Sequence, residues 1–368
     1  MDSGITKLSC KNFRSYGTLA LRFNEPFVVF IGENGAGKTN ILESVSLFSS
    51  GRGLRKAPIA DLNNISSLAN SWNLELGVRI DGYDNFLTTN AYNGRRVAKI
   101  DGTVASSLSK FEDLIWLLWV IPSMDNLFIG DNQNRRKFFD HLVSGLNNDH
   151  KKHLRTISGL QKERLHIISF RQDESWLNVV EKKIAEESII ITKNRLHFLN
   201  IIQQTFTKYP SNFLRCNISI SGDIENIFNR YGDIDSLPVL CDMLSRNRFT
   251  DAEKQTTKFS AQKTSWNVSH IRSGIEAENC STGEQKAFLI SLILATTRIY
   301  RESRLGVPVL LLDDLMVHLD KANRRYLVEE LFDIDVQTFF TGTDEYLFDD
   351  ISNSVQRFLV KKSICQPI

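Results

Sequence analysis

Long hydrophobic runs are missing from this sequence. Its most apolar windows are IWLLWVI at 115–121 and AFLISLILA at 287–295. Both are far shorter than the about 20 residues that a helix needs to cross a bilayer. The first residues, MDSGITKLSCKNFRSYGTLA, also lack the apolar segment of a secretory signal. We therefore expect a cytoplasmic protein without a membrane partner.

Paired cysteines and a large net charge are missing too. The five cysteines include no CxxC motif, and an odd number suits reduced thiols better than a disulfide framework. The 45 Lys and Arg residues nearly balance the 43 Asp and Glu residues, which leaves a net charge of +2. The composition by itself therefore indicates no nucleic-acid partner, and any DNA-binding surface must be local.

The composition is otherwise that of an ordinary folded protein. Hydrophobic residues make up 42% of the chain and charged residues 24%, which excludes a disordered chain. A chain of 368 residues is longer than one domain of ~100–200 residues. We therefore expect either two lobes or one head with a large insertion.

Proline is absent between Pro122 and Pro210, and this stretch is rich in helix-forming residues. Apolar residues recur there three and four positions apart, which predicts amphipathic helices. Proline would break such helices, so its absence agrees with the periodicity. The predicted helices lie at 135–146, 151–170 and 175–206, with interruptions near 145–149 and 172–175.

The flanking segments show the pattern of strands and turns. The strands predicted before the helical stretch lie at 19–23, 26–32, 72–80, 85–92 and 96–102. Those predicted after it lie at 212–222, 264–275, 307–314 and 336–343. Turn signals at Asp81-Gly82 and Asn93-Gly94 favour antiparallel pairing between 72 and 102.

These patterns predict an α/β fold in which both ends of the chain build one head. The head is expected to comprise residues 1–122 and 260–368, with a mixed sheet and flanking helices. Residues 123–259 are expected to form an inserted, mostly helical second lobe.

The strongest motif is GENGAGKT, which matches the P-loop pattern G-x-x-x-x-G-K-[ST] between an apolar strand and a helical segment. Its backbone N–H groups and the following helix N-terminus would surround a phosphate. Lys38 would contact the β- and γ-phosphates, and the Thr39 hydroxyl would bind Mg²⁺. The expected ATP-binding residues are Gly32, Glu33, Asn34, Gly35, Ala36, Gly37, Lys38 and Thr39.

A second metal ligand is expected at the end of the apolar strand VPVLLLDD. Asp313 would share the Mg²⁺ with Thr39, and Asp314 would orient or deprotonate the attacking water. A hydrophobic strand that ends in two carboxylates is a weak signal alone, because such residues are often structural. The P-loop makes the catalytic interpretation of Lys38, Asp313 and Asp314 convincing.

Lys38 and Asp313 lie 275 residues apart, which favours an ABC-type head over a compact GTPase or kinase. The signature of that class is present as CSTGEQKA, directly before a long apolar helix. Ser281, Thr282 and Gly283 would contact the nucleotide of a second subunit at this helix N-terminus. A plain capping box with Glu284 is an alternative interpretation, and the two are compatible.

Across nearly its full length the chain resembles the RecF family, bacterial ATPases of recombinational DNA repair whose heads are related to SMC and Rad50 proteins. The resemblance rests on several motifs, and GRGLR and HLD look most like alphaproteobacterial members. The motifs are KLSCKNFRSYGTLALRF, GENGAGKTNILESVSLFSSGRGLRKA, FIGDNQNRRKFFDHLV, CSTGEQKAFLISLILA, VPVLLLDDLMVHLDKANRRYLVEEL and TFFTGTD.

The resemblance implies roles for particular residues. Asp313 and Asp314 would be the Walker B pair, and Arg14 would lie near the nucleotide. Ser281, Thr282 and Gly283 would form the signature that acts in trans, and Asp320 would lie at the dimer seam. The implied cofactors are ATP and Mg²⁺.

The chain departs from the family pattern at two segments in particular. PSMD, Pro122–Asp125, stands where Pro-Glu-Asp is usual. SHIRSGI, Ser269–Ile275, replaces an HRSD-like segment, with an additional Ile271 and with Gly274 in place of an Asp. These changes concern hydrolysis and subunit coupling more than nucleotide binding.

The resemblance implies a weak ATPase that dimerises on ATP, clamps single-stranded, gapped or double-stranded DNA, and acts with RecR, RecO and RecA. The alternatives are a structural ATPase of the SMC kind, which needs long coiled coils, and an ABC transporter subunit, which needs a membrane partner. Each basic cluster is often only a solvated surface. The four candidates for DNA contact are Arg52/Arg55/Lys56, Arg95/Arg96/Lys99, Arg135/Arg136/Lys137 and Lys151/Lys152/Arg155.

Overall fold

The computed structural model describes two compact units. The described residues are 2–64, 66, 71–92, 94–170, 173–303, 305–351 and 354–368. The first unit comprises residues 1–125, 211–214 and 289–368, and the second comprises residues 126–210 and 215–288. Residues 260–288, which the sequence analysis assigned to the head, therefore belong to the second unit.

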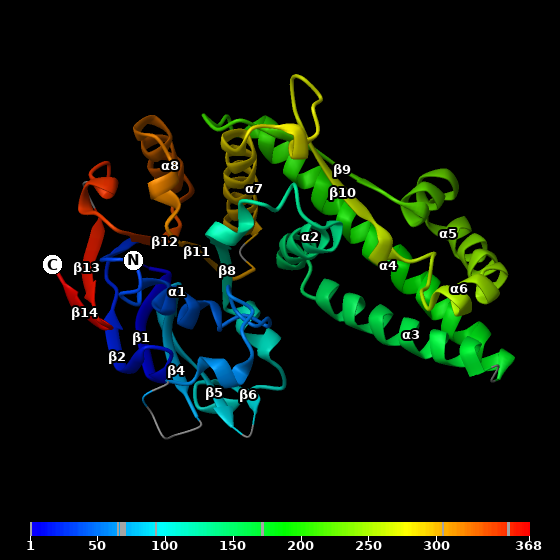
Figure 1. Ribbon diagram of the computed structural model, residues 1–368, viewed down its shortest axis with the longest axis horizontal. Coiled ribbons are helices and arrows are strands. Elements are labelled where there is room, and N and C mark those ends of the chain that lie inside the picture. Colours follow the sequence, from blue (N-terminus) through cyan, green and yellow to red (C-terminus); the bar gives the residue numbers. More distant parts are fainter. Residues whose placement is uncertain are drawn as a thin grey trace. The chain divides into compact units, whose positions relative to one another are not determined.

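The first unit is built around a mixed sheet with the strand order β14-β13-β3-β12-β11-β8 (Figure 1). Every neighbouring pair is parallel except β13 with β14. The strands are β3 (Phe27–Ile31), β8 (Ile115–Val120), β11 (Val307–Leu312), β12 (Gln337–Gly342), β13 (Val355–Lys361) and β14 (Ile364–Pro367).

The middle strands of this sheet are fully buried, since every residue of β3, β11 and β12 is buried. The continuous apolar sequences of β3 and β11 are typical of parallel sheets that are covered on both faces. Phe23 and Phe339 add an edge-to-face ring contact with centroids 5.0 Å apart. Burial of each such side chain contributes about 1.5–3 kcal/mol.

A second, antiparallel sheet of the first unit has the order β2-β1-β4-β5-β6-β7. The predicted antiparallel pairing between 72 and 102 is confirmed by the β4–β5 and β5–β6 ladders. Asn93 of the second turn signal lies outside the described residues. The strands are β1 (Gly4–Phe13), β2 (Tyr16–Arg22), β4 (Asn73–Ile80), β5 (Tyr83–Tyr92), β6 (Arg95–Ile100) and β7 (Thr103–Val104).

The second unit is mostly helical and also contains one antiparallel pair of strands, β9–β10. The three helices predicted in the proline-free stretch are confirmed as α2, α3 and α4. The elements are α2 (Asn132–Leu146), α3 (His150–Phe170), α4 (Glu174–Lys208), β9 (Cys216–Ser221), α5 (Asp223–Arg246), α6 (Arg248–Lys254) and β10 (Ser265–His270).

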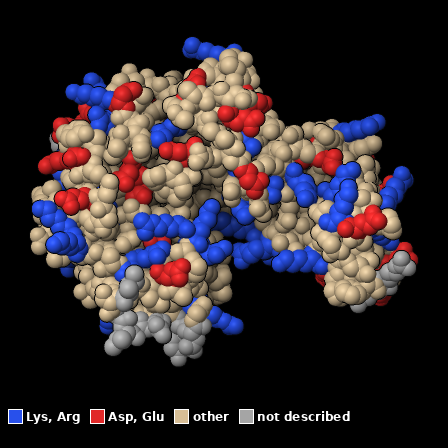
Figure 2. Space-filling view, viewed as in Figure 1, with Lys and Arg blue, Asp and Glu red and all other residues tan. Residues whose placement is uncertain are grey.

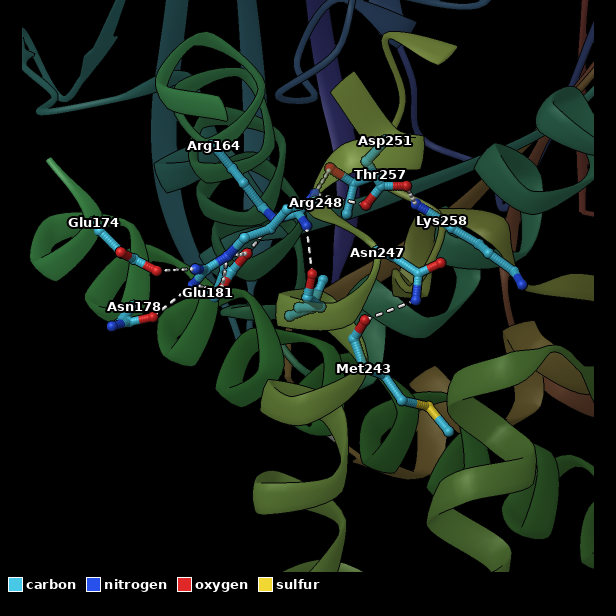
Figure 3. A network of polar contacts seen from close by, with 11 residues as sticks. Arg164, Glu174, Asn178, Glu181, Met243, Asn247, Arg248, Asp251, Thr257 and Lys258 are labelled. Atoms are coloured by element: carbon cyan, nitrogen blue, oxygen red, sulfur yellow. Dashed lines mark hydrogen bonds and ion pairs between the residues drawn. The ribbon is translucent and has the colours of Figure 1, made fainter. Parts of the chain in front are cut away.

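A buried arginine and a partly exposed one join the helices of this second unit. Arg164 of α3 is fully buried and donates to Glu181 of α4 at 3.0 Å and to Asp251 of α6 at 2.7 Å. Arg248 also donates to Glu181, at 2.6 Å from Nη2 to Oε2 (Figure 3). Burial of these charges is tolerated because each guanidinium faces carboxylates and further acceptors.

The remaining helices complete both units. The long helices are α1 (Lys38–Ser46), α7 (Thr282–Ser303) and α8 (Lys321–Ile334). The short 3₁₀ helices are η1 (Ile59–Leu62), η2 (Leu108–Asp113), η3 (Pro122–Met124), η4 (Ala261–Lys263), η5 (Ala277–Asn279), η6 (Leu315–His318) and η7 (Glu345–Phe348). Among the helices of the described residues, none combines the length and the apolar character of a membrane span.

Candidate nucleotide site

The P-loop connects the buried strand β3 to helix α1, as the motif predicts. Gly35 and Gly37 have φ angles of 80° and 114°, in the left-handed region that glycine adopts without steric cost. A Cβ on Gly32 would lie 2.2 Å from the carbonyl oxygen of Val360 on β13. The glycines therefore serve both the turn and the close packing of the loop on the sheet.

Lys38 is the first residue of α1, and its ammonium group points back into the loop. Its Nζ donates to the carbonyl oxygens of Gly32 at 2.6 Å and Glu33 at 3.0 Å. The side chain is 4% exposed, so the charge is held close to the loop by these carbonyls. An incoming phosphate would take over contacts that backbone oxygens now supply.

A cavity lies over the P-loop and α1. Its lining includes five of the predicted P-loop residues and also Asp314. Asn40 and Arg55, which the sequence analysis did not assign to the site, line it as well. The lining residues are Asn34, Gly35, Gly37, Lys38, Thr39, Asn40, Arg55 and Asp314.

Asp313, the predicted Walker B carboxylate, meets the P-loop threonine directly. Thr39 Oγ1 donates to Asp313 Oδ1 at 2.9 Å. Thr341 of β12, the strand between β3 and β11, donates to the same oxygen at 2.9 Å. Burial raises the pKa of Asp313, and the hydrogen bonds from Thr341 and Thr39 oppose that rise.

Asp314 is held beside this group by its backbone. Its φ angle of 51° lies in the left-handed region, and its N–H donates to Thr341 Oγ1 at 2.8 Å. This conformation makes Asp314 the N-cap residue of η6 and lets its side chain line the cavity. Aspartate adopts this region more readily than most non-glycine residues.

The oxygen atoms of Thr39 and Asp313 are suitable ligands for a magnesium ion. Thr39 supplies a hydroxyl oxygen and Asp313 a carboxylate oxygen, and Mg²⁺ prefers hard oxygen ligands. The residues described in the structure contain no cluster of three or more His, Cys, Asp or Glu side chains with metal spacing. One carboxylate plus one hydroxyl agrees with a Mg²⁺ site that substrate phosphates and water complete.

Arg14, predicted near the nucleotide, is engaged by other groups. Its Nη2 and Nε donate to Glu43 of α1 at 2.6 and 2.8 Å, and its Nη1 donates to the carbonyl oxygen of Asp61 at 2.8 Å. Arg55 approaches the fully buried Glu43 at 3.4 Å and donates to Asn40 Oδ1 at 2.8 Å. Glu43 thus ties both arginines to α1.

The signature segment lies in the second unit, where Ser281 precedes α7. Its N–H and its hydroxyl both contact Glu284 Oε2 at 2.8 Å, and the Glu284 N–H donates back to Ser281 Oγ at 3.3 Å. The expected capping box is therefore present. Hydrogen bonds from Ser281 hold the pKa of Glu284 below its ordinary value. Ser281, Thr282 and Gly283 are all exposed.

The departure at Ser269–Ile275 forms a tight exposed turn after β10. The N–H of His270 donates to the Ile275 carbonyl at 2.8 Å, and Gly274 adopts a φ of 70°. The His270 Nδ1 accepts from the backbone N–H groups of Arg272 and Ser273 at 3.0 and 3.2 Å. Glycine at position 274 suits this left-handed backbone. The other departure, Pro122–Asp125, forms η3 and its C-cap.

Three residues of the site, Asn40, Arg55 and Thr341, escaped the sequence analysis. Thr341 lies inside a buried strand, where its hydroxyl resembles an ordinary core threonine until β12 is placed beside β11. Arg55 stood in a basic cluster that was considered only for DNA contact. The motif TFFTGTD, at the end of an apolar strand, is the signal that could have indicated Thr341.

Comparisons with known proteins agree with this geometry. A model of the AAA domain family matches residues 7–286. The DNA replication and repair protein RecF of Rhizobium rhizogenes is 35% identical over 366 residues, which cover 97% of this chain and 96% of that protein. RecF of Rickettsia bellii is 35% identical over 360 residues, covering 95% and 97%.

The same relationship appears among solved structures. The recombination mediator protein RecF-ATPrS of the RecFOR pathway aligns with a TM-score of 0.85 and 21% identity, covering 100% of this chain and 98% of that one. At this identity the match describes the fold, a mixed α/β ATPase head with a helical lobe. With relatives that are 35% identical over 95–97% of the chain, the chain belongs to the RecF family of DNA replication and repair proteins.

Proposed function

We propose that this protein binds Mg-ATP in the cavity over its P-loop and hydrolyses it slowly. The observation that carries the proposal is the hydrogen bond between Thr39 and Asp313, because it joins the two halves of a nucleotide site. Lys38 would contact the β- and γ-phosphates, and Thr39 and Asp313 would hold Mg²⁺, which neutralises charge on the phosphates. Asp314 would orient the attacking water.

The signature supports a site completed by a second copy of the chain. Ser281, Thr282 and Gly283 are exposed at a helix N-terminus, which offers N–H groups and a positive dipole end to an anion. The Ser281 hydroxyl contacts only Glu284 among the described groups, so a γ-phosphate of another protomer could replace this contact. ATP would thereby join two copies head to tail.

The closed dimer would clamp DNA, and hydrolysis would reopen it. The RecF relatives are proteins of DNA replication and repair, which supports DNA as the partner. The aligned RecF structure belongs to the RecFOR pathway, which supports RecR- and RecO-type partners and recombinase loading. The departures at Pro122–Asp125 and Ser269–Ile275 leave the P-loop and the Walker B strand intact.

Two substitutions test the composite site. Lys38→Ala should abolish ATP binding, because it removes the phosphate-binding charge. Ser281→Arg should retain ATP binding but prevent dimerisation, because a large cation would occupy the place of the γ-phosphate. The measurements are equilibrium binding of a fluorescent ATP analogue and sedimentation with Mg-ATP.

Two control variants show whether the effects are specific to positions 38 and 281. Lys11→Ala removes an exposed lysine from β1, and Ser245→Arg adds an arginine at an exposed position of α5. Both should behave as the wild type. If Ser281→Arg dimerises normally with Mg-ATP, the composite site is wrong, whereas loss of ATP binding in Ser245→Arg would indicate misfolding.

A further inference from the structure

Helix α3 presents a positively charged face to solvent. Lys152, Arg155 and Lys162 are exposed, and positions 152, 155 and 162 are three and seven residues apart. At 3.6 residues per turn this spacing places all three on one side of the helix. Figure 2 shows lysine and arginine side chains gathered over the N-terminal half of α3.

Carboxylates do not neutralise this face. The only acidic residue of α3 is Glu163, and its Oε1 accepts from Trp176 Nε1 at 2.8 Å. Within the described residues, Lys152 and Lys162 form no ion pair, and the Arg155 Nε donates to a backbone carbonyl of its own helix at 3.2 Å. The three charges therefore remain available.

Some other exposed cations of the same unit are paired with carboxylates. Lys182 of α4 lies 4.0 Å from Glu186, and Arg246 of α5 donates to Asp242 at 2.9 Å. Lys193 of α4 contacts Asp233 at 2.5 Å. The whole chain carries a net charge of only +2, so the positive charge of this helix face is local. Its cationic side chains repel one another unless an anion binds to them.

Glycine lies in the middle of the charged face. Gly159 is exposed, and a Cβ built on it would meet no atom within 4 Å. Packing within the fold therefore does not require glycine there, although glycine inside a helix costs about 1 kcal/mol relative to alanine. Glycine is expected where another backbone approaches a helix closely.

We propose that the face of α3 formed by Lys152, Arg155, Gly159 and Lys162, here called the α3 basic face, binds the phosphodiester backbone of double-stranded DNA. The proposal rests on the proposed function, which makes DNA the partner. From 152 to 162 the helix extends about 15 Å. Duplex DNA carries one charge per about 1.7 Å of axis, so several phosphates fall within reach of three cations.

Such contacts would not depend on the DNA sequence, because lysine and arginine side chains that bind phosphates do not contact the bases. Each neutralised phosphate releases counterions, so the affinity falls with salt by about 0.9 logarithmic units per contact and per tenfold salt. Because Gly159 has no side chain, the DNA backbone could approach the helix between Arg155 and Lys162.

The test compares three variants with the wild type. The first replaces Lys152, Arg155 and Lys162 with Gln, and the second is Gly159→Glu, which improves helix propensity while adding a negative charge. The matched control replaces Lys182, Lys183 and Arg246 with Gln and loses the same charge from exposed positions of α4 and α5. Binding of a fluorescein-labelled duplex oligonucleotide is measured by anisotropy with Mg-ATP over a series of KCl concentrations.

The α3 triple variant should bind about tenfold more weakly, with a salt slope reduced by roughly two to three units. Gly159→Glu should also weaken binding while the melting temperature stays equal or rises. The control triple should match the wild type. If the α3 triple variant and the control triple variant bind DNA with the same affinity and the same salt slope, the α3 proposal is wrong. If the wild type binds no DNA, the proposed function itself is wrong.

Discussion

Asp313 Oδ1 accepts two hydrogen bonds, each at 2.9 Å. One comes from Thr39 of the P-loop motif and the other from Thr341 of β12. These contacts join β11 to the P-loop and to β12, the strand between β3 and β11. The carboxylate is 6% exposed and its pKa is raised by burial, so a cation would stabilise its ionised form. The candidate nucleotide site is thus organised around one buried carboxylate.

Replacing this carboxylate should separate binding from catalysis. Asp313→Asn keeps the shape but removes the charge that would hold Mg²⁺, so we expect ATP turnover to fall about 100-fold or more. ATP binding without Mg²⁺ should change little. Steady-state turnover over a range of Mg²⁺ concentrations checks this, and wild-type turnover by Asp313→Asn would contradict the Walker B assignment.

Thr341 should tune the same carboxylate. Thr341→Val removes one hydrogen bond to the ionised Asp313, so its pKa should rise further and more Mg²⁺ should be required. The variant should therefore show a higher Mg²⁺ concentration at half-maximal turnover. The control is Thr338→Val, a buried threonine of β12 whose hydroxyl bonds to the Val336 carbonyl at 3.3 Å.

The first glycine of the P-loop should tolerate no side chain. In Gly32→Ala the Cβ would clash with the Val360 carbonyl oxygen, which belongs to a paired backbone, so the loop must shift. We expect a loss of about 1–3 kcal/mol of stability together with weaker ATP binding. Gly51→Ala, where a Cβ meets nothing within 4 Å, is the control and should be close to neutral in thermal unfolding.

The buried arginine network should dominate the stability of the helical unit (Figure 3). Arg164→Met leaves Glu181 and Asp251 without their fully buried partner, which should destabilise the fold by about 3–5 kcal/mol. Arg246→Gln breaks only an exposed pair on α5 and should cost about 0.5 kcal/mol or less. Urea unfolding followed by circular dichroism distinguishes the two variants, and similar midpoints would refute the role of Arg164.

A second buried cluster should make stability depend on pH. Burial lowers the pKa of His150 below its usual value of about 6.5, although its hydrogen bond to Asp140 at 3.2 Å opposes the shift. Because the folded pKa is depressed, the stability that neutral His150 contributes is complete above about pH 6.5 and is lost as the pH falls through the folded pKa.

The measurement is the urea midpoint between about pH 7 and pH 5. His150→Gln should show a smaller loss of stability over this range than the wild type, while His197→Gln, at an exposed position of α4, should keep the wild-type dependence. Parallel curves for His150→Gln and the wild type would mean that His150 does not contribute to the dependence.

Local patterns were enough to predict much of the secondary structure. The P-loop, the strand before Asp313 and the helices α2, α3 and α4 follow from spacings within about thirty-five residues, because periodicity and turn chemistry act locally. The capping box of Ser281 and Glu284 follows for the same reason. By contrast, the run at 115–121 was noted only as apolar, since a short apolar run does not distinguish a buried strand from a helix.

The sequence by itself determined the chemistry of this protein: a phosphate-binding loop, two carboxylates after a buried strand and a serine before a long helix. The tertiary structure decided which residues meet. Thr341 reaches Asp313 because β12 lies beside β11, and Arg164 joins α4 and α6 because those helices pack on α3. Contacts between residues far apart in the chain depend on strand order and packing, and neither is encoded in the spacing of neighbouring residues.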